Sequence, residues 1–223
     1  MDNESLLGPP KVRRRLAKLR DKDVNFSLDA LADASPANGW ELTDLRQALP
    51  GEPPGPPLEN GSWALARQLM RGYEFADPSI VRAYYDPALP LEQRDMLLRL
   101  QAFGRVRLFV GVRVGEVYER TQIVDGRRAR VWGWNYRTLK GHLEMGQMDW
   151  EVWKWTDSGE VEFRVHAVSR TAPIANPVVW LGYRLFRGRE RRAFLQSTLS
   201  RTRAAVDLAT PYSRISGTAS TAG

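Results

Sequence analysis

The chain has 223 residues, of which 43% are hydrophobic and 26% are charged, a composition typical of one soluble globular domain with a sizeable core. It has no cysteine and only two histidines, His142 and His166, which excludes disulfides, thiolate metal sites, cysteine nucleophiles and a three-histidine zinc site within the chain. No apolar run approaches the roughly 20 residues of a membrane span, and the first residues lack the apolar core of a secretory signal, so we expect a cytoplasmic protein.

The net charge is +7, and basic residues cluster in two stretches. Such clusters bind nucleic acid or anionic lipid in some proteins and only solvate the surface in others. The sequence has no zinc-finger, helix-turn-helix or RNA-recognition signature, which favours a solvated surface. The clustered residues are Lys11, Arg13, Arg14, Arg15, Lys18 and Arg20 in the first stretch, and Arg184, Arg187, Arg189, Arg191 and Arg192 in the second.

Three segments differ in composition from the rest of the chain. Residues 1–38 are polar, basic and poor in aromatic side chains, which predicts a flexible N-terminal arm with a short helix near residues 12–20. Residues 49–57 read LPGEPPGPP, and their prolines predict a stiff connector without regular structure. Residues 210–223 are rich in small residues, which predicts a disordered tail, so a single folded domain is expected over residues 39–209.

Short helices are predicted before the main strands. Ser62 is the predicted cap of the helix WALARQLMRG, and Gly72 its predicted end. Asp77 followed by Pro78 predicts the start of a second helix, SIVRAYY, because Asp caps helices and Pro favours their first position. Residues 91–100, which follow a proline, are a third helical candidate.

From Val106 to Val114 the apolar residues recur at every second position, which predicts a strand with one buried face. Gly115–Glu116 and Asp125–Gly126 resemble hairpin turns. Two further strands are therefore expected to follow, through about Leu139.

Residues 147–155 and 160–170 predict a hairpin whose register can be checked by arithmetic. If Trp155 faces Glu160, one face of the hairpin holds only apolar pairs, and opposite charges meet on the other face. A shift by one residue would destroy both patterns. The apolar pairs are Val152–Phe163, Trp150–Val165 and Met148–Ala167, and the charged pairs are Glu151–Arg164 and Asp149–His166.

Asn176 and Pro177 predict the start of a final amphipathic helix that reaches about Ala209. Its apolar residues recur at three- and four-residue steps, and the same stripe contains Arg192. A helix of this kind after an antiparallel sheet is expected to pack across the apolar face of the sheet. The apolar stripe consists of Val178, Leu181, Leu185, Leu195, Leu199 and Val206.

Three segments carry a resemblance to a known family: TLKGHLEMGQ at residues 138–147, EVEFRVHAVSR at 160–170, and the NPVVWLGYRLF that follows. From about residue 39 to 205 the chain resembles the bacterial domain-of-unknown-function family numbered nineteen-ninety. Lys140 and Gln147 stand where many members have a proline and an acidic residue. The residues that match the usual pattern of the family are Thr138, Leu139, Gly141, His142, Glu144, Ser169 and Arg170.

This resemblance implies an α+β fold similar to the START-like, helix-grip superfamily, in which a curved antiparallel sheet packs against a long C-terminal helix around a cavity. Residues 40–45 would supply the first strand. Five of the eight tryptophans lie between Trp132 and Trp155, around a short polar loop, and apolar walls around a polar focus are typical of a pocket. We therefore expect the protein to bind a small apolar molecule. The expected ligand-binding residues are Trp134, Tyr136, His142, Glu144, Trp150, Phe163 and Arg192.

The same residues allow other interpretations. His142 and Glu144, two positions apart in an extended segment, could act as the acid and base of a hydrolase or cyclase, whereas His142 could equally cap backbone groups of a glycine-shaped loop. Trp134 and Tyr136 are either solid core or cavity wall, and Arg192 either lines an opening or reaches solvent. The carboxylates match no known calcium loop, so we expect no metal and no cofactor. In a third interpretation the basic arm and the arginine-rich helix bind nucleic acid or an anionic membrane surface.

Overall fold

The computed structural model describes residues 3–102, 106–174 and 177–210. In this part of the chain, seven strands form one antiparallel sheet in the order β1-β7-β6-β5-β4-β3-β2. The strands are β1 (Glu41–Leu49), β2 (Val81–Tyr84), β3 (Asp95–Ala102), β4 (Val106–Val124), β5 (Arg127–Thr138), β6 (Glu144–Trp155) and β7 (Val161–Thr171). The helices are α1 (Asn3–Leu7), α2 (Pro10–Ala17), α3 (Asp29–Ala32), α4 (Ser62–Arg71) and α5 (Pro177–Ala209), with short 3-10 turns η1 (Pro36–Asn38) and η2 (Leu91–Gln93).

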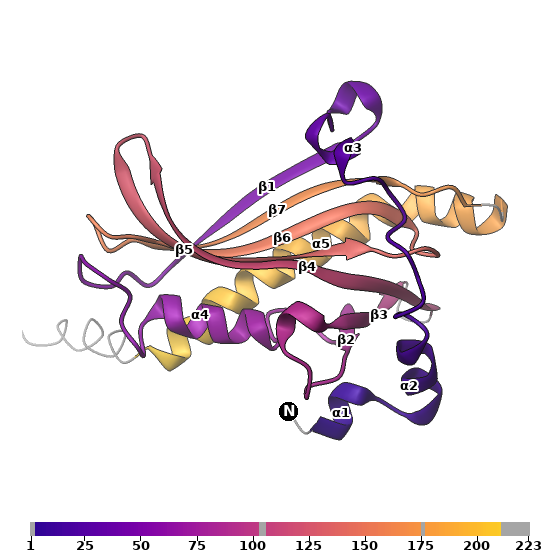
Figure 1. Cartoon of the computed structure of the whole chain (residues 1–223), viewed down its shortest axis with the longest axis horizontal. Coiled ribbons are helices and arrows are strands. Elements are labelled where there is room, and N and C mark those ends of the chain that lie inside the picture. The colour runs from indigo at the N-terminus through magenta and orange to yellow at the C-terminus, as the bar shows by residue number, and fades with distance from the viewer. Residues whose placement is uncertain (1–2, 103–105, 175–176, 211–223) are drawn as a thin grey trace, which may run out of the picture.

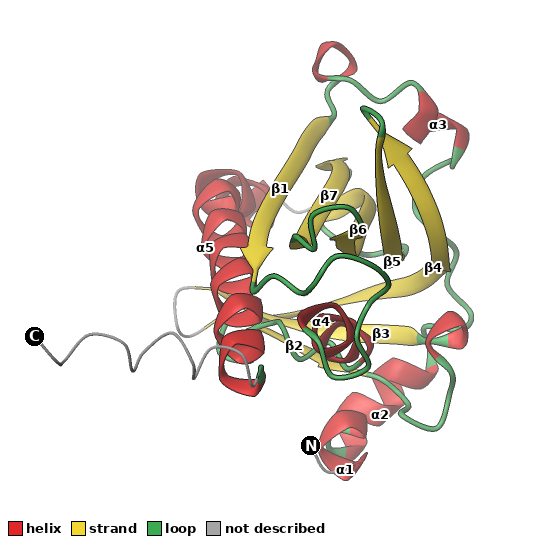
Figure 2. Ribbon diagram, turned by 90° about the vertical axis from the view of Figure 1, so that its left-hand side faces the viewer, coloured by secondary structure: helices red, strands yellow, loops and turns green. Residues whose placement is uncertain are grey.

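The sheet is bent, and α4 and α5 lie together on its concave face (Figures 1 and 2). Helix α5 contacts β1 and α4, and α4 contacts β6 and β7. A curved antiparallel sheet that holds a long C-terminal helix on its concave side is the helix-grip arrangement. The predicted α+β fold is therefore confirmed. Residues 41–45 of the predicted first strand, residues 40–45, lie in β1.

The predicted register of the β6–β7 hairpin is confirmed, because Val152 pairs with Phe163 and Asp149 pairs with His166. The three predicted apolar pairs are buried on the concave face, which also carries the buried polar side chains of Lys154 and Ser169. On the convex face the opposed charges do not bond to each other. Arg164 instead contacts Glu162 at 2.7 Å on its own strand.

Two of the three predicted helices are strands instead. Asp77 accepts hydrogen bonds from the backbone N–H of Ser79 (2.8 Å) and from its hydroxyl (2.7 Å), so it caps a turn rather than a helix. Residues 81–84 then form β2, and after the short turn η2 residues 95–102 form β3. Both strands are covered on both faces, which removes the alternation that would have marked them in the sequence.

Gly115 and Glu116 lie within the long strand β4 and do not form the predicted turn. The pairing of β4 with β5 shifts between Val114 and Val117, which identifies a β-bulge. The predicted turn at residues 125–126 is confirmed, and both residues have positive φ angles, +50° and +77°, as a two-residue hairpin turn requires.

The helix predicted after Ser62 is α4, but its N-cap is Gly61, so Ser62 is the first helical residue and not the predicted cap. Its first turn is capped by Glu52, whose Oε1 accepts a hydrogen bond from the Trp63 backbone N–H at 2.8 Å. The other oxygen of Glu52 accepts one from Lys154 Nζ of β6 at 2.7 Å, and both side chains are buried. Of the predicted connector, residues 49–57, Leu49 is the last residue of β1, and residues 50–57 contain no helix or strand. This buried ion pair therefore fixes the connector and the start of α4 to the sheet.

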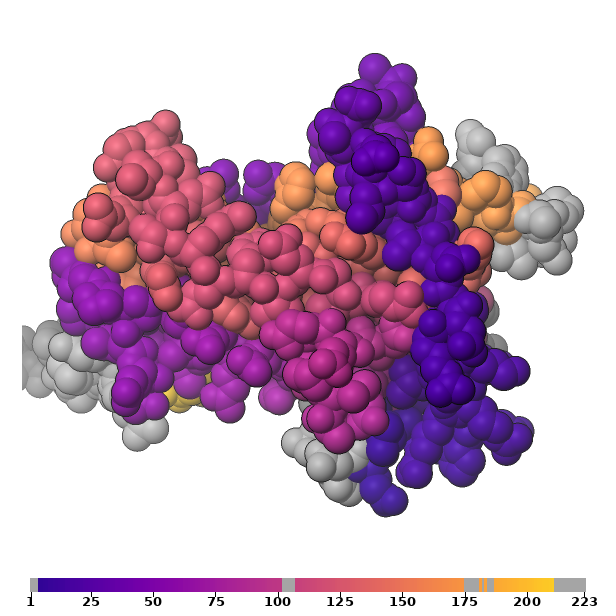
Figure 3. Space-filling model, viewed as in Figure 1, coloured from indigo at the N-terminus to yellow at the C-terminus, as the bar shows by residue number. Residues whose placement is uncertain are grey.

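The N-terminal segment, for which a flexible arm was predicted, packs against the convex side of the sheet. Figure 3 shows it in indigo along one end of the molecule. Val12 and Leu19 are 6% and 2% exposed and pack with Leu97 of β3 and Leu139. Arg113 of β4 donates to the Leu19 carbonyl at 2.9 Å. The apolar side of α2 thus covers part of the core, while the boundary at residue 39 remains a prediction. Most of the predicted tail, residues 211–223, lies outside the described residues.

Candidate functional site

The predicted site residues Trp134, Trp150 and Phe163 lie side by side on the concave face and are fully buried. Trp150 and Phe163 stack with an interplanar angle of 7° and ring centroids 6.2 Å apart. Tyr136 lies next to them, with its ring 6.2 Å from that of Trp150. We call these four side chains the aromatic layer.

Two further rings, which the sequence did not single out, close the aromatic layer from the helix side. Phe75 lies 4.4 Å from Trp150 and 6.0 Å from Phe163, and Tyr73 lies 6.3 Å from Trp134. Both come from the segment after α4, in which Tyr73 has a φ of +57°, an unfavourable backbone angle for a bulky side chain. Rings in contact therefore fill the space in which the resemblance implied a cavity.

A surface depression of about 130 Å³ lies between α4 and α5. Ligand sites usually have volumes of about 300–1,000 Å³. None of the predicted site residues borders this depression, which is too small to be the predicted pocket. Its lining residues are Leu65, Gln68, Leu69, Glu74, Ala205 and Ala209.

Glu144 is the centre of a polar cluster between the end of the sheet and α5. Its carboxylate accepts hydrogen bonds from Tyr183 Oη at 2.7 Å, Arg187 Nε at 2.6 Å and Arg191 Nη1 at 3.1 Å. Burial alone would raise the pKa of Glu144, but the charges of Arg191 and Arg187 together with these hydrogen bonds lower it below its ordinary value. Glu144 is therefore ionised at neutral pH, and both of its oxygens already accept hydrogen bonds.

His142 caps the backbone, which is the second of the two roles that the sequence allowed for this residue. Its Nδ1 accepts a hydrogen bond from the Glu144 backbone N–H at 2.9 Å. Burial lowers the pKa of His142 to about 4, so the imidazole is neutral at pH 7. A general base works best with a pKa near the working pH and with a free acceptor. The contacts of His142 and Glu144 therefore argue against the predicted acid–base pair.

Arg192 is exposed, which agrees with the interpretation in which its side chain reaches solvent. The side chains that α5 turns toward the sheet are Arg187 and Arg191, which are 20% and 10% exposed. Leu181 of the predicted apolar stripe is 50% exposed, whereas Leu195 and Val206 are buried as predicted. The side chains of Val178 and Leu185 lie outside the described residues.

Several buried polar groups on the concave face and on the facing side of α5 have no hydrogen-bond partner in the part of the chain that the structure describes. In folded proteins such groups are few and each requires an explanation. Tyr73 Oη also lacks a partner with hydrogen-bond geometry, although it faces the hydroxyl of Tyr136. The other groups are Trp134 Nε1, Trp150 Nε1, Ser169 Oγ, Arg187 Nη2, Arg191 Nε and Thr198 Oγ1.

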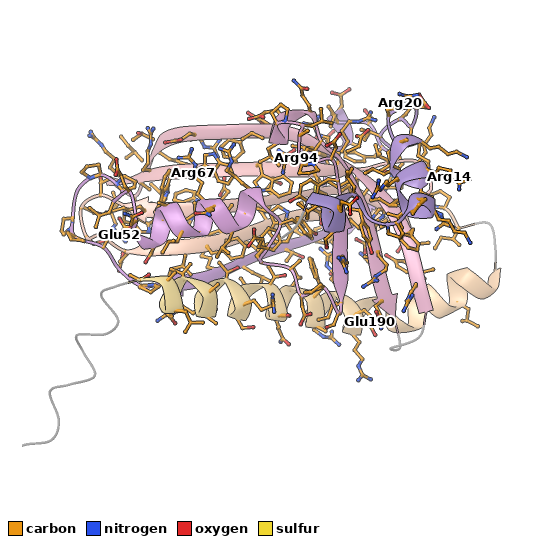
Figure 4. The ribbon with its side chains drawn as sticks, turned by 90° about the horizontal axis from the view of Figure 1, so that it is seen from below. Arg14, Arg20, Glu52, Arg67, Arg94 and Glu190 are labelled. Atoms are coloured by element: carbon orange, nitrogen blue, oxygen red, sulfur yellow. The ribbon has the colours of Figure 1, made fainter. Side chains whose placement is uncertain are left out.

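The basic stretch of residues 11–20 lies at the opposite end of the molecule from Glu52 (Figure 4). Arg14 and Arg20 are exposed there, while Val12 and Leu19 face the core. Binding of an anionic partner to this stretch remains a prediction. Within residues 3–102, 106–174 and 177–210, no group of three His, Cys, Asp or Glu side chains is placed to hold a metal ion, and no helix is long and apolar enough to cross a membrane.

A bent antiparallel sheet, a long C-terminal helix on its concave side and aromatic side chains between them define a helix-grip protein. Residues 25–193 match the model of the family described as Domain of unknown function (DUF1990), and the chain therefore belongs to that family. A search of curated proteins found no match.

Several solved structures are similar to this one at low sequence identity. The di-domain ARO/CYC StfQ from the steffimycin biosynthetic pathway shares 13% identity and a TM-score of 0.49, over 91% of this chain and 62% of that one. Ara h 8.0201 shares 11% identity and a TM-score of 0.44, over 75% of this chain and 98% of that one. TTHA0849 from Thermus thermophilus shares 9% identity and a TM-score of 0.44, over 76% of this chain and 99% of that one.

Proposed function

We propose that this protein binds a small, largely apolar molecule between the concave face of the sheet and helices α4 and α5. The observation that carries this proposal is the set of buried polar groups without partners around the aromatic layer, Trp134 Nε1 and Trp150 Nε1 above all. Each such group costs about 1–3 kcal/mol when it stays unbonded. A solid core would be more stable with apolar side chains at these positions, whereas a ligand that supplies hydrogen-bond acceptors accounts for both indole donors.

Tyr73 and Phe75 occupy the position that we assign to the ligand. They belong to the connection between α4 and β2, and Tyr73 has a strained backbone angle, with a φ of +57°. A residue in such a conformation costs on the order of 1–3 kcal/mol, which reduces the cost of moving the segment. An entering ligand would replace the two rings against Trp150 and Phe163 and would restore the apolar contacts that they lose.

Removal of the Phe75 ring by substitution tests this proposal, with the binding of a dye as the measurement. Titration with the uncharged dye Nile red, followed by its fluorescence, is expected to show saturable binding to the wild-type protein. Phe75→Ala is expected to bind the dye at least tenfold more tightly, because a ring that fills the site is gone. Circular dichroism of the variant checks that it is folded.

Leu19→Ala is the matched control, because Leu19 is equally buried but lies under α2 on the convex side of the sheet. It is expected to leave the affinity for Nile red unchanged. Two results would contradict the proposal: the absence of saturable binding to both wild type and Phe75→Ala, or an equal gain in affinity in Leu19→Ala. The second result would show that any void in the core attracts the dye.

A further inference from the structure

We infer that the polar end of the ligand is an uncharged oxygen acceptor, such as a ketone or quinone oxygen, and that Arg191 and Ser169 bind it. This inference rests on the proposed function and specifies the chemical class of the ligand. It follows from the position of these two side chains, from their unused hydrogen-bonding groups and from the balance of charge around them.

The guanidinium of Arg191 spans the end of the sheet above Ser169. Its Nη2 donates to Thr43 Oγ1 of β1 at 3.1 Å, and its Nη1 donates to Glu144 Oε2 of β6 at 3.1 Å. Strand β7 runs between these two strands, and its Ser169 pairs with Glu41 of β1 and with Gly146 of β6. Ser169 therefore lies between the two anchor points of the guanidinium.

Both side chains have a hydrogen-bonding group to offer. Ser169 is 5% exposed, and its hydroxyl has no partner among the residues that the structure describes. Arg191 Nε likewise makes no hydrogen bond, since the nearest carboxylate oxygen, Glu41 Oε1, lies 3.6 Å away. An oxygen atom that accepts from both would satisfy two buried groups at once.

The charges around this position are already balanced, which decides between a neutral and an anionic oxygen. Arg187 contacts Glu144 at 2.6 Å and Glu41 at 2.9 Å, and Arg191 contacts the same two carboxylates at 3.1 and 3.6 Å. Two cations thus face two anions in a partly buried cluster. A ligand carboxylate would add a third anion without a cation of its own, and a buried unpaired charge is strongly unfavourable. A carbonyl oxygen accepts the same hydrogen bonds without this penalty.

The aromatic layer favours a flat ring system as the body of this ligand. Trp150 and Phe163 are nearly parallel, and the side chains that now fill the space in front of them are the flat rings of Tyr73 and Phe75. Aromatic rings pack well against each other in offset or edge-on contacts. A planar polycyclic ketone or quinone therefore matches the chemistry of both parts, because its rings match the aromatic layer and its oxygen matches Ser169 and Arg191.

Three compounds with one skeleton test the inference: anthracene, anthraquinone and anthraquinone-2-carboxylate, each in competition with Nile red. Wild-type protein is expected to bind anthraquinone at least tenfold more tightly than either of the other two. Ser169→Ala is expected to lose most of the preference over anthracene without loss of stability, because its hydroxyl has no partner among the described residues. Ser200→Ala, whose hydroxyl is on the exposed side of α5, is the control and is expected to retain the preference.

Glu144→Gln tests the charge argument separately, since it leaves two cations facing one carboxylate. This variant is expected to bind anthraquinone-2-carboxylate at least tenfold more tightly than wild type does. Equal affinities of wild type for anthracene and anthraquinone, or a wild-type preference for the carboxylate, would overturn the inference and leave the proposed function standing. If none of the three compounds displaces Nile red, and Nile red itself does not bind saturably, the proposed function fails as well.

Discussion

Removal of the Phe163 ring tests which face of the β6–β7 hairpin forms the core. The ring is fully buried, is stacked on Trp150 and lies 6.0 Å from Phe75. Emptying an aromatic core position of this kind costs about 3–5 kcal/mol. Phe163→Ala is therefore expected to lower the free energy of unfolding by about 3–5 kcal/mol. For a chain of this size, each ~1 kcal/mol lowers Tm by about 2–4 °C, so Tm is expected to fall by about 6–20 °C.

His166→Ala is the comparison, because His166 lies three residues further along the same strand on the opposite face. Its side chain is exposed and faces Asp149 across the strand pair. An exposed side chain outside any ion pair contributes under about 1 kcal/mol, so this variant is expected to be nearly as stable as wild type. Urea unfolding followed by tryptophan fluorescence and by circular dichroism measures both variants. If His166→Ala proved more damaging than Phe163→Ala, the assignment of the buried face would be wrong.

Two further predictions concern buried charges. Lys154→Met leaves the carboxylate of Glu52 without its cation and is expected to lower the free energy of unfolding by about 3–5 kcal/mol, measured by urea unfolding at neutral pH. The double variant with Glu52→Gln should recover part of this loss. A single variant as stable as wild type would show that the ion pair is dispensable. The pKa of about 4 for His142 predicts that the stability of the protein falls as the pH drops from about 6.5 to 4, because the unfolded chain takes up the proton first. His142→Asn retains an acceptor for the Glu144 N–H and should flatten this part of the pH profile of the urea midpoint, so an unchanged slope would contradict the assigned cause.

The β6–β7 hairpin could be predicted from the sequence because two independent patterns fix its register. The concave face requires apolar partners, such as Val152 opposite Phe163, and the convex face requires polar ones. A shift by one residue violates both, so a single register remains. The hydrogen bonds of the convex face could not be predicted, because long side chains such as Arg164 choose among several carboxylates within reach.

One cause accounts for two differences between the sequence interpretation and the structure in the first half of the chain. The segment at residues 3–24 covers the convex face of β2 and β3, where Tyr84 and Leu97 pack against Val12 and Leu19. With both faces covered, these strands carry apolar residues at consecutive positions and lose the period of two. The basic residues of α2, interpreted as the mark of a mobile arm, occupy only its exposed side. Recognition of Val12 and Leu19 as a buried pair would have corrected both predictions together.

The polar residues of α5 that face the sheet lie at four-residue steps from the buried Leu195 and not along the predicted stripe of apolar residues. Steps of four back from Leu195 reach Arg191, Arg187 and Tyr183, and all three of these residues contact Glu144. The leucine stripe is misleading because the side of α5 that faces the sheet is only half apolar. A charged residue on a buried helix position is costly unless it is paired, so its presence there indicates a partner on the sheet. In this chain the partner is Glu144, which Arg187 and Arg191 contact as the counterion of α5, and these contacts argue against the predicted acid–base pair with His142.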